Sequence, residues 1–287
     1  METRGRQIMV GYDGSSGGTD ALDWAVREAR LRDLPLTICY TWTGAPAGAG
    51  AATVLAGGEA GAAVPVRENA EAVLARGVSH AKACDPSVTP RPLSVCGPPT
   101  RVLCEQCADT GMLVVGARGD GGLEGMQLGS VSFQVAMHAP VPVTVVRGHW
   151  RTVPGHYPLP VVVGTDGSVA SQAALDLAVE EAELREVPLV AVCALSDAAG
   201  VLGTARDIEA DFASRMSKLQ AGHPELVLHR RLEQGAPRSA LLEAASRGQL
   251  LVVGARGRGG LREMMLGSVS IAVLHHALCP VTVVRGA

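Results

Sequence analysis

The sequence lacks the features that mark nucleic-acid-binding, membrane or secreted proteins. Its 287 residues carry a net charge of −3 and contain no run of lysine and arginine, so we expect no nucleic-acid partner. No apolar run reaches the roughly 18 residues that a membrane-spanning helix needs, and residues 1–6 lack the long apolar stretch of a secretory signal. These absences favour a cytoplasmic protein that does not contact a membrane.

Cysteine is too irregularly spaced to build a disulfide framework. The chain has seven cysteines, an odd number, and it is long enough to form a core without cross-links. Cys104 and Cys107 have the spacing of a redox or metal pair, but Leu242 and Ala245 stand at the matching positions of the second half. The pattern favours two small apolar residues on a packed helix face over a reactive pair.

What the sequence does contain is a repeat that covers most of its length. Residues 8–15 recur as residues 161–168, at a shift of 153 positions, and residues 116–132 recur as residues 254–270, at a shift of 138 positions. The connection between these two segments is therefore fifteen residues shorter in the second half. Such a duplication indicates two domains of the same fold.

The domain limits follow from where the repeat begins and ends. We expect one domain over residues 1–148, a linker over residues 149–159 and a second domain over residues 160–287. In the first half, residues 44–63 are rich in glycine and alanine, and we interpret them as a mobile loop near the mouth of the functional site.

In each half, short apolar runs alternate with segments of helical spacing. The runs predict strands near residues 8–11, 36–40, 89–95, 113–115 and 142–146, and near residues 161–164, 189–193, 225–232, 250–253 and 280–284. Alternation of this kind is typical of an α/β fold with a parallel, doubly wound sheet and helices on both faces.

The most informative stretch is the duplicated glycine-rich segment. Residues 116–132 follow the buried fourth strand and lead into a helix, and residues 254–270 repeat that order. Glycines allow the backbone to approach a ligand closely, and the free N–H groups at a helix N-terminus attract an anion. A strand, a glycine-rich loop and a helix start therefore indicate a phosphate-binding site.

The combined pattern resembles the universal stress protein family in its tandem two-domain form, over nearly the entire chain. The resemblance rests on Asp13 and Asp166 after the first strands, and on two glycines three apart followed, after nine residues, by Gly-Ser in both halves. In that family this spacing marks the ATP-binding branch. The resemblance implies two Rossmann-like (HUP-type) domains, each with a five-stranded parallel sheet of order 3-2-1-4-5 and a crevice between strands one and four.

The resemblance and the glycine pattern together give the expected nucleotide-binding residues. In the first domain they are Asp13, Thr41, Val115, Gly116, Arg118, Gly119, Gly129, Ser130, Val131 and Ser132. In the second domain they are Asp166, Val253, Gly254, Arg256, Gly257, Gly267, Ser268, Val269 and Ser270.

Each group has an expected role. Main-chain N–H groups near Gly119, Gly129 and Ser130 would bind the phosphates of ATP, and the hydroxyls of Ser130 and Ser132 would add hydrogen bonds. Gly116 would let the nucleotide lie against the end of the fourth strand, and Thr41 matches the position where the family binds adenine. Asp13 and Asp166 would reach the ribose or the base, or share Mg²⁺ with the phosphates.

Two structural alternatives stay open at this level. Asp13 and the serine that follows could simply cap the first helix, and the glycine loop could only turn the chain. The repetition of the same glycines over fourteen positions favours binding. The two sites should also differ, because the charges from Arg118 to Gly129 sum to −1 and those from Arg256 to Gly267 to +2. That count predicts that polyphosphate prefers the second site.

The expected activity is regulatory. No histidine, cysteine or second carboxylate recurs beside Asp13 in both halves, so we identify no general base or nucleophile. We expect an ATP-binding regulatory protein of the stress response with an unidentified protein partner, and at most weak ATP hydrolysis. The alternatives are a slow Mg-dependent ATPase or nucleotidyl-transfer enzyme, and an interaction module without a ligand.

The fifth strand of each half should be a sheet edge that needs cover. From the family resemblance, we expect residues 143–146 and 281–284 to pair antiparallel within one chain as a pseudo-dimer. Association of two chains into a homodimer is a further expectation.

Overall fold

The computed structural model describes residues 7–43, 63–119, 127–147, 150, 158–195, 205–258 and 265–286. The connection expected to be mobile, residues 44–63, lies outside this part of the chain except for its last residue. The contacts divide the chain into two compact units, Met1–Val141 and Pro142–Ala287.

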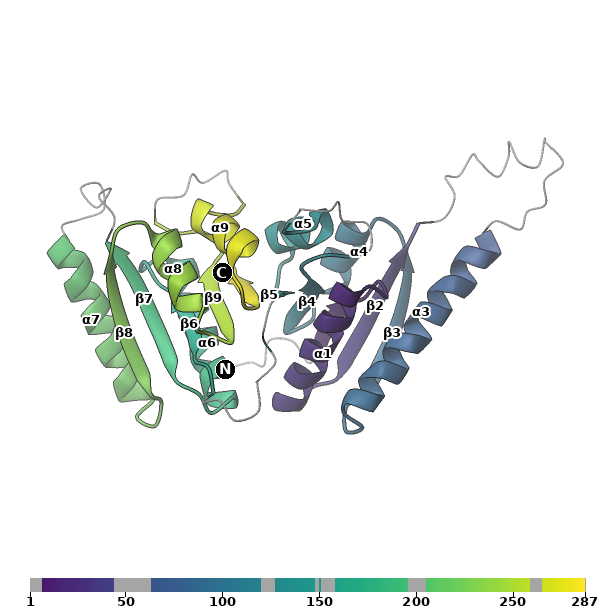
Figure 1. Ribbon diagram of the computed structural model, residues 1–287, viewed down its shortest axis with the longest axis horizontal. Coiled ribbons are helices and arrows are strands. Elements are labelled where there is room, and N and C mark those ends of the chain that lie inside the picture. The colour runs from purple at the N-terminus through teal and green to yellow at the C-terminus, as the bar shows by residue number, and fades with distance from the viewer. Residues whose placement is uncertain are drawn as a thin grey trace. The chain divides into compact units, whose positions relative to one another are not determined.

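The first unit alternates strands and helices (Figure 1). Its elements are β1 (Ile8–Gly11), α1 (Ser16–Leu31), β2 (Leu36–Trp42), α3 (Ala63–Cys84), β3 (Pro90–Cys96), α4 (Pro99–Gln106), β4 (Met112–Gly116) and α5 (Ser130–His138). The strands pair in the order β3-β2-β1-β4, all parallel. α1 contacts α3 and α4 contacts α5, which places the two helix pairs on opposite faces when every crossover is right-handed.

The second unit repeats this arrangement. Its elements are β5 (Val143–Val146), β6 (Val161–Gly164), α6 (Val169–Leu184), β7 (Leu189–Leu195), α7 (Ala205–Gly222), β8 (Leu228–Gln234), α8 (Pro237–Ala245), β9 (Leu250–Gly254), α9 (Ser268–His276) and β10 (Val281–Val284). Strands β8-β7-β6-β9-β10 lie in that order and are parallel, which confirms the order 3-2-1-4-5 predicted for the repeat.

The expected pairing of the fifth strands is confirmed. β5 runs antiparallel to β10, with Thr144 opposite Thr282, and the two hydroxyl oxygens lie 2.7 Å apart in a hydrogen bond. This strand belongs to the first repeat in sequence, but its contacts group it with the second unit. The valines of both strands are buried, so the pairing covers two apolar sheet edges at once.

The core follows from the apolar runs. All five residues of β4 are buried, as are four of the five residues of β9, which is typical of parallel strands covered on both faces. α1 and α6 each bury one apolar face on the sheet, and each also buries a glutamate near its C-terminal end. Glu28 pairs with Arg32 and Glu181 pairs with Arg185, so neither buried carboxylate lacks a partner.

No helix in the described part of the chain is long and apolar enough to cross a lipid bilayer.

Candidate functional site

A cavity of about 460 Å³ opens at the carboxyl ends of β1, β2 and β4 in the first unit. Its size falls within the range of small-molecule sites, about 300–1,000 Å³. The structure brings together here all ten residues that the sequence predicted for the first domain: Asp13, Thr41, Val115, Gly116, Arg118, Gly119, Gly129, Ser130, Val131 and Ser132.

The turn after β1 settles which residue caps α1. Ser15 is the cap, because its hydroxyl oxygen accepts the N–H of Gly18 at 2.9 Å. Asp13 does not cap the helix but binds the cap residue: its Oδ1 accepts the Ser15 N–H at 3.0 Å and the Ser15 O–H at 2.5 Å. Gly14 between them has φ +85°, a conformation that favours glycine. The carboxylate of Asp13 therefore shapes the turn and stays exposed.

The glycine loop lies directly against this turn. A Cβ atom added at Gly119 would clash with Oδ2 of Asp13, and one added at Gly116 would clash with the main-chain oxygen of Gly17 in α1. Gly17 in turn faces the main-chain oxygen of Arg118 so closely that it also has no room for a side chain. These glycines let α1, β4 and the loop meet backbone to backbone, which draws the two halves of the predicted site together.

The N-terminal end of α5, called its head below, is open towards the cavity. Its N-cap residue, Gly129, has no side chain to accept a hydrogen bond from the first turn, and its own N–H donates to Ala117 at 2.8 Å. The first N–H groups of a helix have no partner within the helix. Ser130, Val131 and Ser132, which carry such groups, all line the cavity. This is the arrangement that binds anions at helix N-termini.

The hydroxyl groups of the two serines in this turn have different environments. The hydroxyl of Ser132 is buried and donates to the carbonyl of Gly116 at 2.6 Å, whereas Ser130 is exposed. The second unit repeats this, with the Ser270 hydroxyl donating to Gly254 at 2.7 Å and Ser268 exposed. Ser132 and Ser270 therefore tie the helix to the strand end, and Ser130 and Ser268 are the hydroxyls that face outwards.

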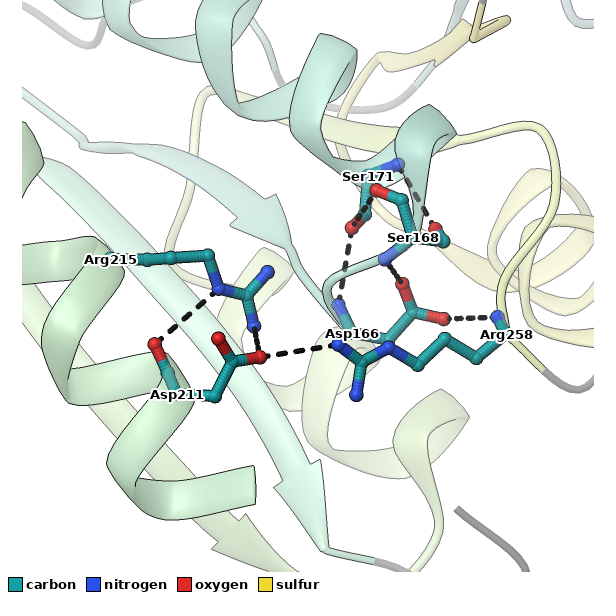
Figure 2. Close-up of polar contacts among 6 residues, drawn as sticks. All are labelled: Asp166, Ser168, Ser171, Asp211, Arg215 and Arg258. Atoms are coloured by element: carbon teal, nitrogen blue, oxygen red, sulfur yellow. Dashed lines mark hydrogen bonds and ion pairs between the residues drawn. The ribbon is translucent and has the colours of Figure 1, made fainter. Parts of the chain in front are cut away.

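The second unit builds the same turn around Asp166. Its Oδ1 accepts the N–H of Ser168, the N-cap of α6, at 3.0 Å, and its Oδ2 accepts the N–H of Arg258 at 2.7 Å. Figure 2 shows these contacts. Burial alone would raise the pKa of Asp166, but these hydrogen bonds, with further contributions from the Ser168 and Ser171 side chains, outweigh burial and lower the pKa. The carboxylate is thus held in its charged form.

The remaining residues predicted for the second domain lie in matching elements. Val253 and Gly254 end β9, Gly267 caps α9 without a side-chain hydrogen bond, and Ser268, Val269 and Ser270 form the first turn of α9. A Cβ atom on Gly257 would clash with Asp166 Oδ2, as on Gly119 in the first unit. Arg256 accepts a hydrogen bond on its carbonyl from the Ser168 hydroxyl at 3.3 Å.

An ion-pair network at the second site was not predicted. Asp211 of α7 contacts the guanidinium of Arg258 at 3.2 Å and that of Arg215 at 2.9 Å, and Figure 2 shows Asp211 between the two. At the repeat spacing of 138, the first half has Val73 and Gly77 where the second has Asp211 and Arg215. The loop charge count left out α7, which adds one charge of each sign, Asp211 and Arg215, so the net charge is unchanged, but the Arg258 guanidinium is paired with a carboxylate.

Other residues of the first cavity were missed as well. They are Gly11, Tyr12, Gly18, Cys39, Tyr40, Pro99 and Leu103. Most are neighbours of predicted residues on β1 or β2, and topology alone could have added them. Pro99 and Leu103 come from α4, whose approach to this end of the sheet had no motif to signal it. Together they give the cavity an apolar wall.

The cysteines of this unit carry no reactive thiol at the cavity. Burial raises the pKa of Cys39, which lines the cavity, to about 12, and likewise that of Cys107. Cys107 is buried and its thiol donates to the Cys104 carbonyl at 3.4 Å. Neither Cys104 nor Cys107 is in a disulfide bond, which fits the packed-face interpretation of this pair.

The chain matches known proteins over nearly its whole length. The model of the universal stress protein family matches residues 5–147 and again residues 159–285. A universal stress protein of Mycolicibacterium smegmatis is 37% identical, over 97% of this chain and 96% of its own. One of Mycobacterium tuberculosis is 33% identical over the same shares.

A solved structure agrees with the fold. A universal stress protein from Archaeoglobus fulgidus aligns with a TM-score of 0.73 at 20% identity, covering 98% of this chain and 99% of that one. With two copies of the family domain in tandem, this chain belongs to the universal stress protein family.

Proposed function

We propose that this protein binds ATP, with Mg²⁺, in the crevice of each repeat and acts as a regulatory protein of the stress response. The observation that carries the proposal is the cavity of about 460 Å³ in which the open head of α5, the glycine loop and Asp13 meet. The site offers main-chain donors for phosphate at one side and an apolar wall at the other. The donors suit the phosphates of a nucleotide, and the apolar wall suits its base.

The phosphates would lie at the head of α5. Main-chain N–H groups of Ser130, Val131 and Ser132 are the donors, the exposed hydroxyl of Ser130 adds a further donor, and Arg118 lines the same cavity. The dipole of the nine-residue helix favours a negative charge at this end. Val269 and its neighbours in α9, with Arg256 nearby, would do the same in the second unit.

The nucleoside would lie towards β2 and α4. Thr41 near the end of β2, Val115 near the end of β4, and Leu103 of α4 line that side of the cavity. Gly116 shares this wall, so the base can approach the strand end. Exposed Asp13 has an oxygen beside Gly119, where a carboxylate fits either a ribose hydroxyl or a Mg²⁺ ion held jointly with the phosphates.

The two sites would bind with different strength. In the second unit Arg258 pairs with Asp211, so an incoming phosphate competes with a carboxylate for that guanidinium. The preference of polyphosphate for the second site stays a prediction, with a smaller margin than the loop charges alone would give.

The test is to purify the protein without added nucleotide, denature it, and identify by mass spectrometry what is released. The stripped protein is then titrated with ATP, AMP and adenosine, with and without magnesium. Release of adenine nucleotide, or ATP binding that is tighter than adenosine binding, supports the proposal. About two nucleotides per chain would mean that both sites are filled, and one that they differ. No release and no binding at millimolar ATP would contradict it.

A slow Mg-dependent ATPase or nucleotidyl-transfer enzyme is the second candidate, because the carboxylate of Asp13 lies beside the proposed phosphate site. Steady release of ADP that is lost in Asp13→Asn and Asp166→Asn, with ATP still bound, would favour this candidate. ADP release that is unchanged in both variants would exclude a role of these two carboxylates in hydrolysis and so contradict this candidate.

The proposal also keeps three wider expectations from the sequence. They are a cytoplasmic location, a regulatory protein partner that recognises the nucleotide-bound state, and association of two chains into a homodimer. Size-exclusion chromatography with light scattering, with and without ATP, tests the last. A monomer at every concentration would exclude the homodimer.

A further inference from the structure

Three side chains of different types converge between α1 and α3, on the first unit. Asp23 comes from α1, and His80 and Cys84 come from α3, one helical turn apart. One carboxylate oxygen, one imidazole nitrogen and one sulfur lie within 4.8 Å of one another. Residues at i and i+4 share one face of a helix, so α3 presents nitrogen and sulfur side by side to the carboxylate of α1.

The distances show that all three donor atoms point at one place. Nε2 of His80 lies 2.5 Å from Oδ1 of Asp23 and 3.4 Å from Sγ of Cys84, and that sulfur lies 3.2 Å from the same Oδ1. Three ligands about 2.0 to 2.3 Å from a tetrahedral zinc ion would be about 3.3 to 3.6 Å apart. Two of the three distances are close to this range, and the third needs His80 and Asp23 to separate by about 1 Å.

We propose that Asp23, His80 and Cys84 form a zinc site, with water as the fourth ligand. A thiolate, an imidazole and a carboxylate are the donors that Zn²⁺ takes, whereas Mg²⁺ and Ca²⁺ take oxygen. On binding, the thiol gives its proton to solvent and the sulfur takes the metal in its place. With three protein ligands and water in the fourth position, the site would be accessible and would exchange its ion with the solution.

The same three residue types could instead activate a nucleophilic cysteine, but the geometry argues against this. In such a relay the carboxylate bonds one ring nitrogen and the nucleophile faces the other. Here Asp23 and Cys84 both approach Nε2 of His80. One nitrogen cannot orient the ring and accept the thiol proton at once, whereas a metal placed between the three atoms uses all of them.

An ion could reach the site without unfolding the protein. Cys84 is exposed, the His80 side chain is 39% exposed and that of Asp23 is 14% exposed. The second repeat has Asp176 at the position of Asp23, but Lys218 and Gly222 at those of His80 and Cys84. The chain thus contains its own control, a matching helix pair with only one of the three ligands.

The experiment titrates Zn²⁺ into the reduced full-length chain, without nucleotide, against a chromophoric zinc chelator. We expect one ion per chain whose affinity falls at least about tenfold in Cys84→Ser and in His80→Gln, since even the loss of an outer partner of a zinc ligand costs 10–100-fold. The controls Cys96→Ser, which removes another exposed thiol, and Asp176→Asn should bind zinc as the parent does. Circular dichroism confirms that each variant is folded.

Cobalt gives a second measurement that reports the ligands themselves. Co²⁺ at this site should show a thiolate-to-metal absorption band that Cys84→Ser removes and Cys96→Ser leaves. Zinc binding of the parent that is equally tight in Cys84→Ser and His80→Gln would overturn the proposal. So would zinc binding that is lost in Cys96→Ser, or no binding by the reduced parent at micromolar zinc.

Discussion

Replacing Ser130 by glutamate would place a carboxylate at the N-terminal end of α5, where we propose that the phosphates of ATP bind. Ser130 is exposed and is the first residue of the helix, so the longer side chain has room. A negative charge in the first turn also suits the helix dipole. The substitution should therefore leave the fold intact and oppose only a negatively charged ligand.

The size of the effect follows from Coulomb's law. Two unit charges about 6 Å apart repel by about 0.7 kcal/mol in water and about 2.8 kcal/mol at the lower effective dielectric of a protein surface. For an exposed position and a phosphate carrying more than one charge, we expect a loss of about 2 kcal/mol at low salt, which is roughly 30-fold in Kd. Near 1 M salt the loss should fall below about threefold, because the Debye length shrinks to about 3 Å.

Isothermal titration of ATP, AMP and adenosine into the parent, Ser130→Glu and Ser130→Gln separates charge from shape. Glutamine has nearly the size of glutamate without its charge, and its amide N–H can replace the hydroxyl donor of Ser130, so Ser130→Gln should stay within about threefold of the parent. Adenosine should bind all three alike. Ser268→Glu makes the same test of α9. If glutamate and glutamine weaken ATP equally, or if ATP binds Ser130→Glu as tightly as the parent, phosphate does not lie at this helix.

Three further predictions concern the second unit. Asp211→Asn should tighten ATP binding there about threefold at low salt, or about 0.7 kcal/mol, because it releases the guanidinium groups of two partly exposed arginines from their carboxylate. Glu209→Gln on the same helix is the control, and equal effects of the two substitutions would show that the ion pairs do not oppose ATP binding. Glu181→Ala should lower the free energy of unfolding, measured with urea, by about 3 kcal/mol, because it removes the carboxylate that pairs with the buried guanidinium of Arg185. A loss under about 1 kcal/mol would contradict this. The lowered pKa of Asp166 contributes stability above about pH 4, and this contribution is lost as pH falls through the folded-state pKa. Asp166→Asn should therefore flatten the acid limb of a plot of unfolding free energy against pH, and an unchanged limb would exclude this role.

The architecture could be predicted from the sequence because the same pattern of strands and helices occurs in both halves of the chain. Strands such as β4 and β9 are continuous apolar runs buried on both faces, and the strand order came with the family resemblance. The crevice followed from that order, since β1 and β4 pair directly and end side by side. Asp13 and Gly119 are far apart in sequence, yet a side chain on the glycine would meet the carboxylate.

What could not be predicted depends on contacts without a local pattern. The sequence left open whether Asp13 capped α1, and only the hydrogen bonds show that Ser15 does. Asp211 reaches Arg258 from a helix whose packing the repeat does not fix. The approach of His80 to Asp23 joins residues 57 positions apart, on helices whose spacing indicates only that each has a buried face.

The most direct test of the central claim is to follow the main-chain N–H signals of Gly129, Ser130, Val131 and Ser132 by NMR during titration with ATP and with adenosine. Phosphate bound at the head of α5 should shift these signals strongly with ATP and inorganic triphosphate, and far less with adenosine. The same should hold for residues 267–270 at the head of α9. If ATP binds and these signals stay in place, or if adenosine shifts them equally, the helix heads do not hold phosphate and the proposed function fails.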